Sequence, residues 1–250
     1  MKAIIFDVDG TLADTERDGH RVAFNLAFAD AGLDWVWSEE MYGRLLAVTG
    51  GKERIRHYIE LEEPEYPTVD DLSAWIASLH ASKTEHFVSL LQAGEIPLRS
   101  GVRRLLTEAH EAGVTLAIAT TTTPQNVSAL LEHAMFPGAE SWFKIIGAGD
   151  IVPNKKPSSD IYDYVLAELG LSAAECIAIE DSHNGLSSSL EAGLTTIVTV
   201  NGYTEAEDFT GAALVLDQMG ESNDHCHVLQ GDREKKTVLD LEWVKSVWSR

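Results

Sequence analysis

The sequence predicts an α/β protein in which a parallel sheet is interrupted by an all-helical insertion. A short apolar run at residues 3–6 leads directly to Asp7 and Asp9, as expected of a buried strand whose carboxyl end carries polar side chains. Residues 16–91 show helical spacing of apolar side chains and no strand-like alternation. From Pro97 onward, strand-like and helix-like segments alternate, which is typical of a parallel sheet covered by helices on both faces.

The composition indicates a globular chain with a strongly acidic balance. Its 250 residues suffice for one α/β domain with a smaller insertion, and 44% of them are hydrophobic. The formal net charge of −21 argues against a nucleic-acid partner, because nucleic-acid phosphates need a basic surface. An anionic substrate would therefore need local positive charge at its binding site.

Three features predict a cytoplasmic protein without a membrane partner. No apolar run approaches the roughly 18 residues of a membrane span. The N-terminus leads directly into the first strand, so we expect no signal peptide. Cys176 and Cys226 do not make a disulfide framework, which favours a reducing compartment. We expect a monomer or a weak oligomer.

The insertion is predicted to contain several helices. Helical spacing covers residues 16–31, and Ser38 precedes two glutamates as the N-cap of a helix that we expect to end near residues 49–51. A further helix is expected from Lys52, and an amphipathic one over residues 69–91. These elements predict a helical domain at residues 16–94, inserted into a core made of residues 1–15 and 95–250.

The core elements follow from alternating patterns and turn residues. Helices are expected over residues 101–112, 124–133, 158–169, 184–192 and 238–248, and strands over residues 114–119, 143–148, 176–179, 195–200 and 213–216. The strand at 213–216 is expected to form an edge of the sheet. Residues 220–236 are polar and are predicted to form a loop. Within it, His225, Cys226 and His227 have metal-binding side chains, but their spacing favours a loop over a zinc site.

Polar residues that handle phosphate or metal recur after the predicted strands. They are two aspartates at 7 and 9, four threonines at 120–123, a Lys-Lys-Pro run at 155–157 and an acidic pair at 180–181. The threonines and the acidic pair each also fit a helix cap or turn, and the Lys-Pro pair also fits a solvated turn. Their occurrence together and in this order favours one shared site at the carboxyl edge of the sheet.

This set of motifs resembles the haloacid dehalogenase (HAD) superfamily over the whole chain. The resemblance implies a Rossmann-like core with a helical cap of the C1 type. It further implies that Asp7 is the nucleophile and Asp9 the general acid/base. A Mg²⁺ cofactor would be held by Asp7, the Asp9 carbonyl and Asp181, with Glu180 as the neighbour of Asp181. By the same resemblance, Lys156 and the Thr120 hydroxyl, with Thr121 beside it, would bind phosphate.

Phosphoryl transfer explains why these residue types are needed. The oxygens of a phosphate ester repel an attacking carboxylate, so their charge must be neutralised before Asp7 can attack. Mg²⁺ prefers carboxylates and phosphate oxygens, and Lys156 adds a fixed positive charge. An aspartate at position 9 suits a leaving alcohol that needs a proton, which disfavours a dehalogenase.

The insertion carries a segment suited to a second anionic group. Gly50 and Gly51 offer bare amides at a helix start, followed by Lys52 and Arg54. An ordinary helix start with paired charges is the alternative interpretation.

Together with Glu16, His20, Arg21 and Lys83, this segment is similar to the CbbY-type HAD phosphatases. Those enzymes act on xylulose 1,5-bisphosphate, an inhibitor of Rubisco in the Calvin cycle. The resemblance implies a small sugar phosphate or bisphosphate as the partner. A β-phosphoglucomutase, a phosphoglycolate phosphatase and a catalytically silent binding protein are the alternatives.

Overall fold

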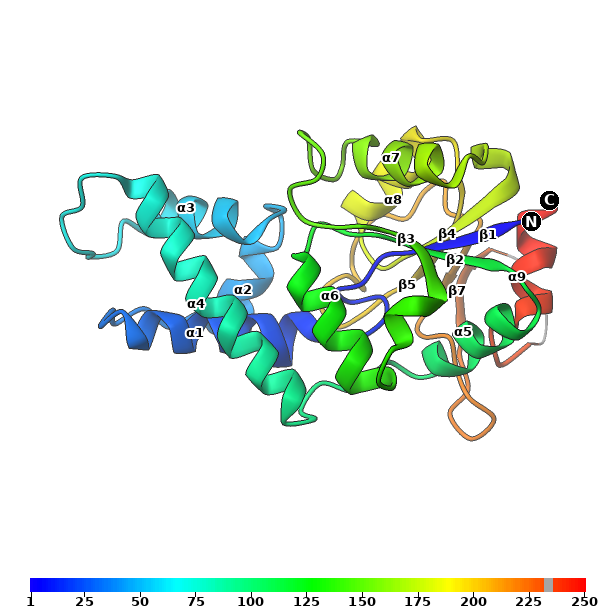
Figure 1. Ribbon diagram of the computed structural model, residues 1–250, viewed down its shortest axis with the longest axis horizontal. Coiled ribbons are helices and arrows are strands. Elements are labelled where there is room, and N and C mark those ends of the chain that lie inside the picture. Colours follow the sequence, from blue (N-terminus) through cyan, green and yellow to red (C-terminus); the bar gives the residue numbers. More distant parts are fainter. Residues whose placement is uncertain (232–235) are drawn as a thin grey trace.

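The computed structural model describes residues 1–231 and 236–250, and these residues form a seven-stranded sheet in the order β3-β2-β1-β4-β5-β6-β7 (Figure 1). The strands are β1 (Ala3–Phe6), β2 (Thr115–Ala119), β3 (Phe143–Gly147), β4 (Cys176–Glu180), β5 (Thr195–Thr199), β6 (Leu214–Leu216) and β7 (Val228–Gly231). All neighbouring pairs are parallel except β6 and β7. The predicted α/β fold with a largely parallel sheet is confirmed.

Helices cover both faces of this sheet (Figure 1). Helices α5 (Val102–Glu111) and α6 (Pro124–Leu130) lie on one face, and α7 (Asp160–Leu169) and α8 (His183–Glu191) on the other. Strand β1 is buried between the two layers: Ile4 belongs to the apolar cluster on one side, and Ile5 to the cluster on the other. Because side chains alternate along a strand, this central strand is apolar throughout. The carboxyl end of β1 therefore lies among the central strands, at the edge of the sheet where the parallel strands end.

Side-chain caps fix where several of these helices begin. The Thr123 hydroxyl accepts from the amide of Asn126 at the start of α6, where Pro124 takes the first position. Ser182 accepts from the amide of Gly185 at the start of α8. Each such cap contributes about 1 kcal/mol to stability. Both capped helices start directly beside the carboxyl edge of the sheet.

The insertion is helical, as predicted. It consists of a π-helical turn (Glu16–His20) followed by α1 (Arg21–Asp30), α2 (Glu39–Leu45), α3 (Gly51–Glu62) and α4 (Leu72–Gln92). Most of its buried apolar side chains form a cluster of their own, whereas Ala23, Phe87 and Leu91 pack in the cluster of the core. The separate cluster is rich in aromatic rings, namely Phe24, Phe28, Trp35, Trp37 and Tyr42. This separate core supports our proposal that residues 16–94 form a domain of their own.

The two ends of the insertion lie side by side. Ala13 and Leu98 form an isolated antiparallel bridge, and the amide of Arg99 donates to the carbonyl of Leu12 at 2.9 Å. The Arg99 guanidinium then donates to the carbonyls of Thr199 at 3.0 Å and Asp217 at 2.9 Å. This arginine ties the junction to the ends of β5 and β6.

The C-terminal region differs from the sequence prediction. Residues 228–231 of the predicted loop form β7, which pairs with β6, so residues 213–216 do not provide the edge of the sheet. The sequence pattern for strand β7 was weak because β7 has only four residues and two of them, Gln230 and Gly231, are not apolar. Residues 232–235 of the predicted loop lie outside the described residues.

Some predicted helix bounds were also wrong. The helix after Ser38 ends at Leu45 and not near residue 49, and α9 (Leu241–Trp248) starts three residues later than expected, at the side-chain cap of Asp240. In the part of the chain that the structure describes, no helix combines the length and the apolar character that crossing a membrane requires. Cys176 and Cys226 are free and buried.

Candidate active site

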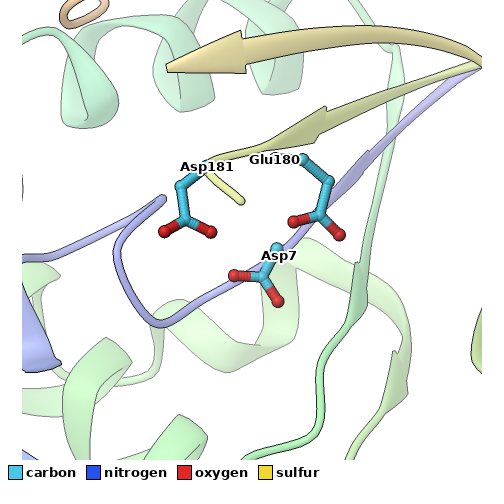
Figure 2. Close-up of side chains that lie close together, drawn as sticks. All are labelled: Asp7, Glu180 and Asp181. Carbon is cyan, nitrogen blue, oxygen red and sulfur yellow. The ribbon is translucent and has the colours of Figure 1, made fainter. Parts of the chain in front are cut away.

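Three carboxylates meet at the carboxyl edge of the central strands. Asp7 follows β1, and its amide donates to the carbonyl of Ile179 in β4 at 3.0 Å. This pairing brings Asp7 beside Glu180 and Asp181 at the end of β4, and Figure 2 shows the three side chains pointing toward one another. One oxygen from each lies within 4.8 Å of the others, and all three residues are buried.

Lys156 reaches this cluster from the loop after β3. Its Nζ donates to Asp7 Oδ1 at 2.7 Å, to Glu180 Oε1 at 2.6 Å and to the carbonyl of Ala119 at 2.9 Å. The Tyr162 hydroxyl donates to the same Glu180 oxygen at 2.5 Å. Glu180 thus holds Lys156 against Asp7, and the structure brings together Asp7, Lys156 and Asp181, which the sequence places at one edge of the sheet.

One lysine facing three buried carboxylates leaves excess negative charge. Burial raises the pKa of Asp7 to about 8, despite the opposing attraction of Lys156. Burial, together with Asp7 and Glu180, also raises the pKa of Asp181 well above its ordinary value. Glu180 Oε2 is buried and has no hydrogen-bond partner. A divalent cation would relieve this repulsion, so the donor set fits a metal ion.

The raised pKa of Asp7 leads to a prediction about the metal-free protein. Because the folded state favours the protonated form, stability from this group is full below about pH 4 and is lost as the pH rises to about 8. A cation needs the ionised carboxylates and therefore binds better at the upper end of this window. We expect MgCl₂ to raise the melting temperature more at about pH 7.5 than at about pH 5.5. An equal gain at both pH values, or an unchanged gain in Asp181→Asn, would contradict the assignment.

Asp9 faces away from the three carboxylates and toward the insertion. Its Oδ1 accepts from the Thr15 hydroxyl at 2.7 Å and lies 2.7 Å from His20 Nε2. The buried ammonium of Lys83 donates to His20 Nδ1 at 2.7 Å, so the His20 ring donates from Nε2 to Asp9. Burial alone would raise the pKa of Asp9, but His20 and Thr15 hold it well below its ordinary value.

Lys83 completes this chain from α4. Burial lowers the pKa of Lys83 to about 8, although Asp9 pulls in the opposite direction. This series of hydrogen bonds therefore connects Asp9 with Lys83 in α4 of the insertion. The Asp9 carboxylate is not part of the cluster of Asp7, Glu180 and Asp181, and the metal contact of the Asp9 carbonyl stays a prediction.

Among the described residues, two cavities larger than about 400 Å³ lie between the insertion and the core. Their volumes are about 450 Å³ and 500 Å³, within the range of small-molecule sites. Asp9, Glu16, Arg54 and Thr121 line both of them. The larger contains Asp7, Thr120, Lys156 and Asp181, and the smaller contains Lys52, Lys83 and Lys155. The two cavities thus share lining residues, and both acidic and cationic side chains line each of them.

The threonines after β2 form part of the cavity walls. Thr120 is buried, its amide donates to the carbonyl of Gly147, and its hydroxyl accepts from the amide of Thr122 at 3.3 Å. Thr121 is placed between the two cavities. Both positions suit the predicted contact with phosphate oxygens, which stays a prediction.

The insertion residues are placed less uniformly than the sequence suggested. Arg54 is buried; its Nη1 donates to the Tyr42 hydroxyl at 2.8 Å and lies 3.8 Å from Glu16 Oε2. Tyr42 in turn donates to Glu16. Arg21 donates to the carbonyl of Arg17 and lines neither cavity. The structure therefore does not bring Arg21 together with the other predicted residues.

Gly50 and Gly51 serve close packing. Gly50 has φ of 99°, and a Cβ there would lie 2.2 Å from Glu53 Oε2. A Cβ on Gly51 would lie 2.3 Å from His80 Nε2. These glycines therefore let Glu53 and His80 approach the start of α3, in addition to lining the smaller cavity.

Several residues around the site had no role assigned from the sequence, although Lys155 belongs to the Lys-Lys-Pro run at 155–157. Asp150 and Lys155 lie in the loop after β3, and Tyr162 reaches Glu180 from α7. Asn201 Nδ2 donates to Asp181 Oδ2 at 2.7 Å. Asn201 follows an apolar strand and Lys155 stands in that run, so both positions offered a signal, whereas Tyr162 lies inside a helix.

Comparisons with known proteins show the family of the chain. The family of haloacid dehalogenase-like hydrolases matches residues 1–193. The plasmid-borne protein CbbY of Cupriavidus necator is 48% identical over 221 residues, which cover 88% of this chain and 87% of that protein. A crystal structure of CbbY from Rhodobacter sphaeroides with phosphate is 47% identical, with a TM-score of 0.81, and covers 87% of this chain and 94% of that one.

A second crystal structure from Rhodobacter sphaeroides holds a CbbY variant in complex with xylulose-(1,5)bisphosphate. It is 46% identical to this chain, covers 87% of it and 94% of the other chain, and has a TM-score of 0.82. The matched range, residues 1–193, contains the positions of Asp7, Lys156 and Asp181 and the strands β1 to β4. The chain therefore belongs to the family of haloacid dehalogenase-like hydrolases, as a CbbY-like enzyme.

Proposed function

We propose that this CbbY-like phosphatase uses Mg²⁺ to remove one phosphate from a sugar bisphosphate, and most specifically converts xylulose 1,5-bisphosphate to xylulose 5-phosphate. The observation that carries the proposal is the pair of adjoining cavities, one with Asp7 and Lys156 and the other with Lys52 and Lys155. A substrate with a phosphate at each end fits positive charge in both. The xylulose bisphosphate bound by the Rhodobacter sphaeroides relative supports the same substrate class.

In the first half of the proposed reaction, an Asp7 carboxylate oxygen forms a bond to phosphorus while the bond from phosphorus to the sugar oxygen breaks. Asp9, whose pKa is low, takes the Nε2 proton of His20 at 2.7 Å and passes it to the departing sugar oxygen, while His20 Nδ1 takes a proton from the Lys83 ammonium at 2.7 Å. Lys156 lies 2.7 Å from Asp7 and neutralises charge on the transferring group. The products are a sugar alcohol group and an aspartyl phosphate on Asp7.

In the second half, water attacks the phosphorus of the aspartyl phosphate. Asp9 takes the proton from this water, the bond between phosphorus and Asp7 breaks, and inorganic phosphate leaves. Mg²⁺, held by Asp7, the Asp9 carbonyl and Asp181, would neutralise phosphoryl oxygens throughout. Glu180 keeps Lys156 in place through the contact of 2.6 Å.

Phosphate release measured over a substrate panel tests the proposal. The panel contains xylulose 1,5-bisphosphate, ribulose 1,5-bisphosphate and sugar monophosphates, each with and without MgCl₂. We expect the highest kcat/KM for xylulose 1,5-bisphosphate and no activity after chelation. Release that is faster from every monophosphate would refute the bisphosphate assignment. Accumulation of glucose 6-phosphate from β-glucose 1-phosphate would identify a mutase instead.

We further propose that the enzyme acts in the cytoplasm. Both described cysteines are free, which fits a reducing compartment. Sugar phosphates are the small-molecule partners in this proposal, and a monomer or weak oligomer remains our expectation.

A further inference from the structure

A carboxylate from the core lies between two lysines at the mouth of the smaller cavity. Asp150 Oδ2 lies 2.6 Å from Lys52 Nζ, and Asp150 Oδ1 lies 2.9 Å from Lys155 Nζ. Lys52 belongs to α3 of the insertion, whereas Asp150 and Lys155 belong to the loop after β3 of the core. All three residues line the same cavity. This ion cluster joins the two parts of the molecule.

Lys155 is positioned by packing as well as by charge. Its side chain is only 18% exposed, and its Cδ would lie 3.2 Å from a Cβ on Gly50. Its Nζ is also 4.0 Å from Glu53 Oε2 on the insertion. The lysine stem thus runs past the start of α3 and delivers its ammonium group to the cavity mouth.

The other cations of this cavity already have buried partners. Arg54 donates from Nη1 to the Tyr42 hydroxyl, with its Nε left without a hydrogen-bond partner, and Lys83 donates to His20. Breaking these buried contacts would leave polar groups without partners, which is costly. Lys52 and Lys155, in contrast, share a carboxylate whose side chain is 60% exposed and can return to water. These two lysines are therefore the cations that an incoming anion can capture most easily.

We propose that Lys52 and Lys155 together form the subsite for the second phosphate, and that the Asp150 carboxylate occupies it until substrate arrives. This inference rests on the proposed bisphosphatase function and adds Lys155 and Asp150 as specificity-determining residues. A phosphate group presents more charge and more acceptor oxygens than a carboxylate, so it displaces Asp150 from the lysine pair. The two hydrogen bonds from the lysines lower the pKa of Asp150 to about 2, so the carboxylate stays charged at neutral pH.

The test compares steady-state kinetics on a bisphosphate and on a monophosphate of the same sugar, xylulose 1,5-bisphosphate and xylulose 1-phosphate. Asp150→Asn removes the competing charge and is expected to lower KM for the bisphosphate about two- to fivefold, the scale of an exposed ion pair. Lys155→Gln is expected to raise that KM about tenfold. Both changes leave KM for the monophosphate within about twofold, because it lacks the second phosphate. Lys155→Arg, which keeps the charge, is expected to stay near the wild type.

Glu168→Gln is the matched control, since it removes one negative charge at an exposed position of α7. If it lowers KM for the bisphosphate as much as Asp150→Asn does, the effect is one of net charge and the proposal fails. A raised KM in Asp150→Asn, or equal changes for both substrates in Lys155→Gln, also overturns it while the proposed function stands. If the wild type releases no phosphate from the bisphosphate, the proposed function and this subsite fall together.

Discussion

Replacing Asp7 by Asn is expected to reduce turnover by a factor of about 10⁴ or more, because the amide cannot form the phosphoenzyme bond. The fold should survive, since Asn keeps the shape of a side chain that is already enclosed by Lys156 and Thr11. Phosphate release under saturating substrate measures the loss, and circular dichroism and the melting temperature report the fold.

Asp70→Asn provides the matched control for this experiment. Asp70 is exposed in the segment between α3 and α4, far along the chain from the site. We expect it to keep wild-type turnover. If the Asp7 variant retains more than about one per cent of the activity while folded, Asp7 is not the nucleophile.

Replacing Lys156 by Met is expected to impair both catalysis and stability. The change leaves Asp7 and Glu180 buried without their shared cation, and breaking a buried ion pair costs about 3–5 kcal/mol. Denaturant unfolding with a chelator present measures this loss. Turnover is expected to fall by a factor of about 10² to 10³, because one of the charges that stabilise the transferring phosphoryl group is gone.

The pH dependence of this loss separates lost charge from lost packing. Without Lys156, the carboxylate pKa values rise further, and protonation at about pH 5 removes the repulsion. The difference from the wild type in unfolding free energy should therefore be smaller at about pH 5 than at about pH 7.5. Lys144→Met, at an exposed position of β3, should leave stability within about 0.5 kcal/mol. A deficit that does not change with pH would point to packing.

The central part of the site could be predicted from the sequence because the predicted metal-binding aspartates directly follow their strands. Asp7 directly follows a strand of four buried residues, and Asp181 directly follows a strand of five. Parallel strands that pair must present their carboxyl ends together, so these aspartates could be placed near each other without coordinates. The order of the strands then determined which pair became neighbours.

Lys156 was harder to place because it lies nine positions beyond the end of β3. Its motif predicted a phosphate contact, but not the bond to Glu180 that holds it. The cluster of Lys52, Asp150 and Lys155 was beyond reach for a related reason. It joins residues about a hundred positions apart in two separately packed parts, and periodicity carries no information about such contacts.

The errors at the insertion and at the edge strand β7 had a different origin. Gly50 and Gly51 suggested exposed amides, whereas tight contacts with Glu53 and His80 explain them equally well. Residues 228–231 were missed as a strand because an edge position needs few apolar side chains. In both places the sequence showed a composition whose meaning depended on a neighbour from another element.

The bridge between Ala13 and Leu98 has a consequence for engineering. Since both crossings into the helical part are adjacent, that part can be excised or exchanged as a cassette while the order of the strands stays the same. Loop closure depends only slowly on the length of the segment that is spliced between these points. One catalytic platform can therefore be retargeted by grafting, provided that the new helical part keeps the contacts that His20 and Lys83 supply to Asp9.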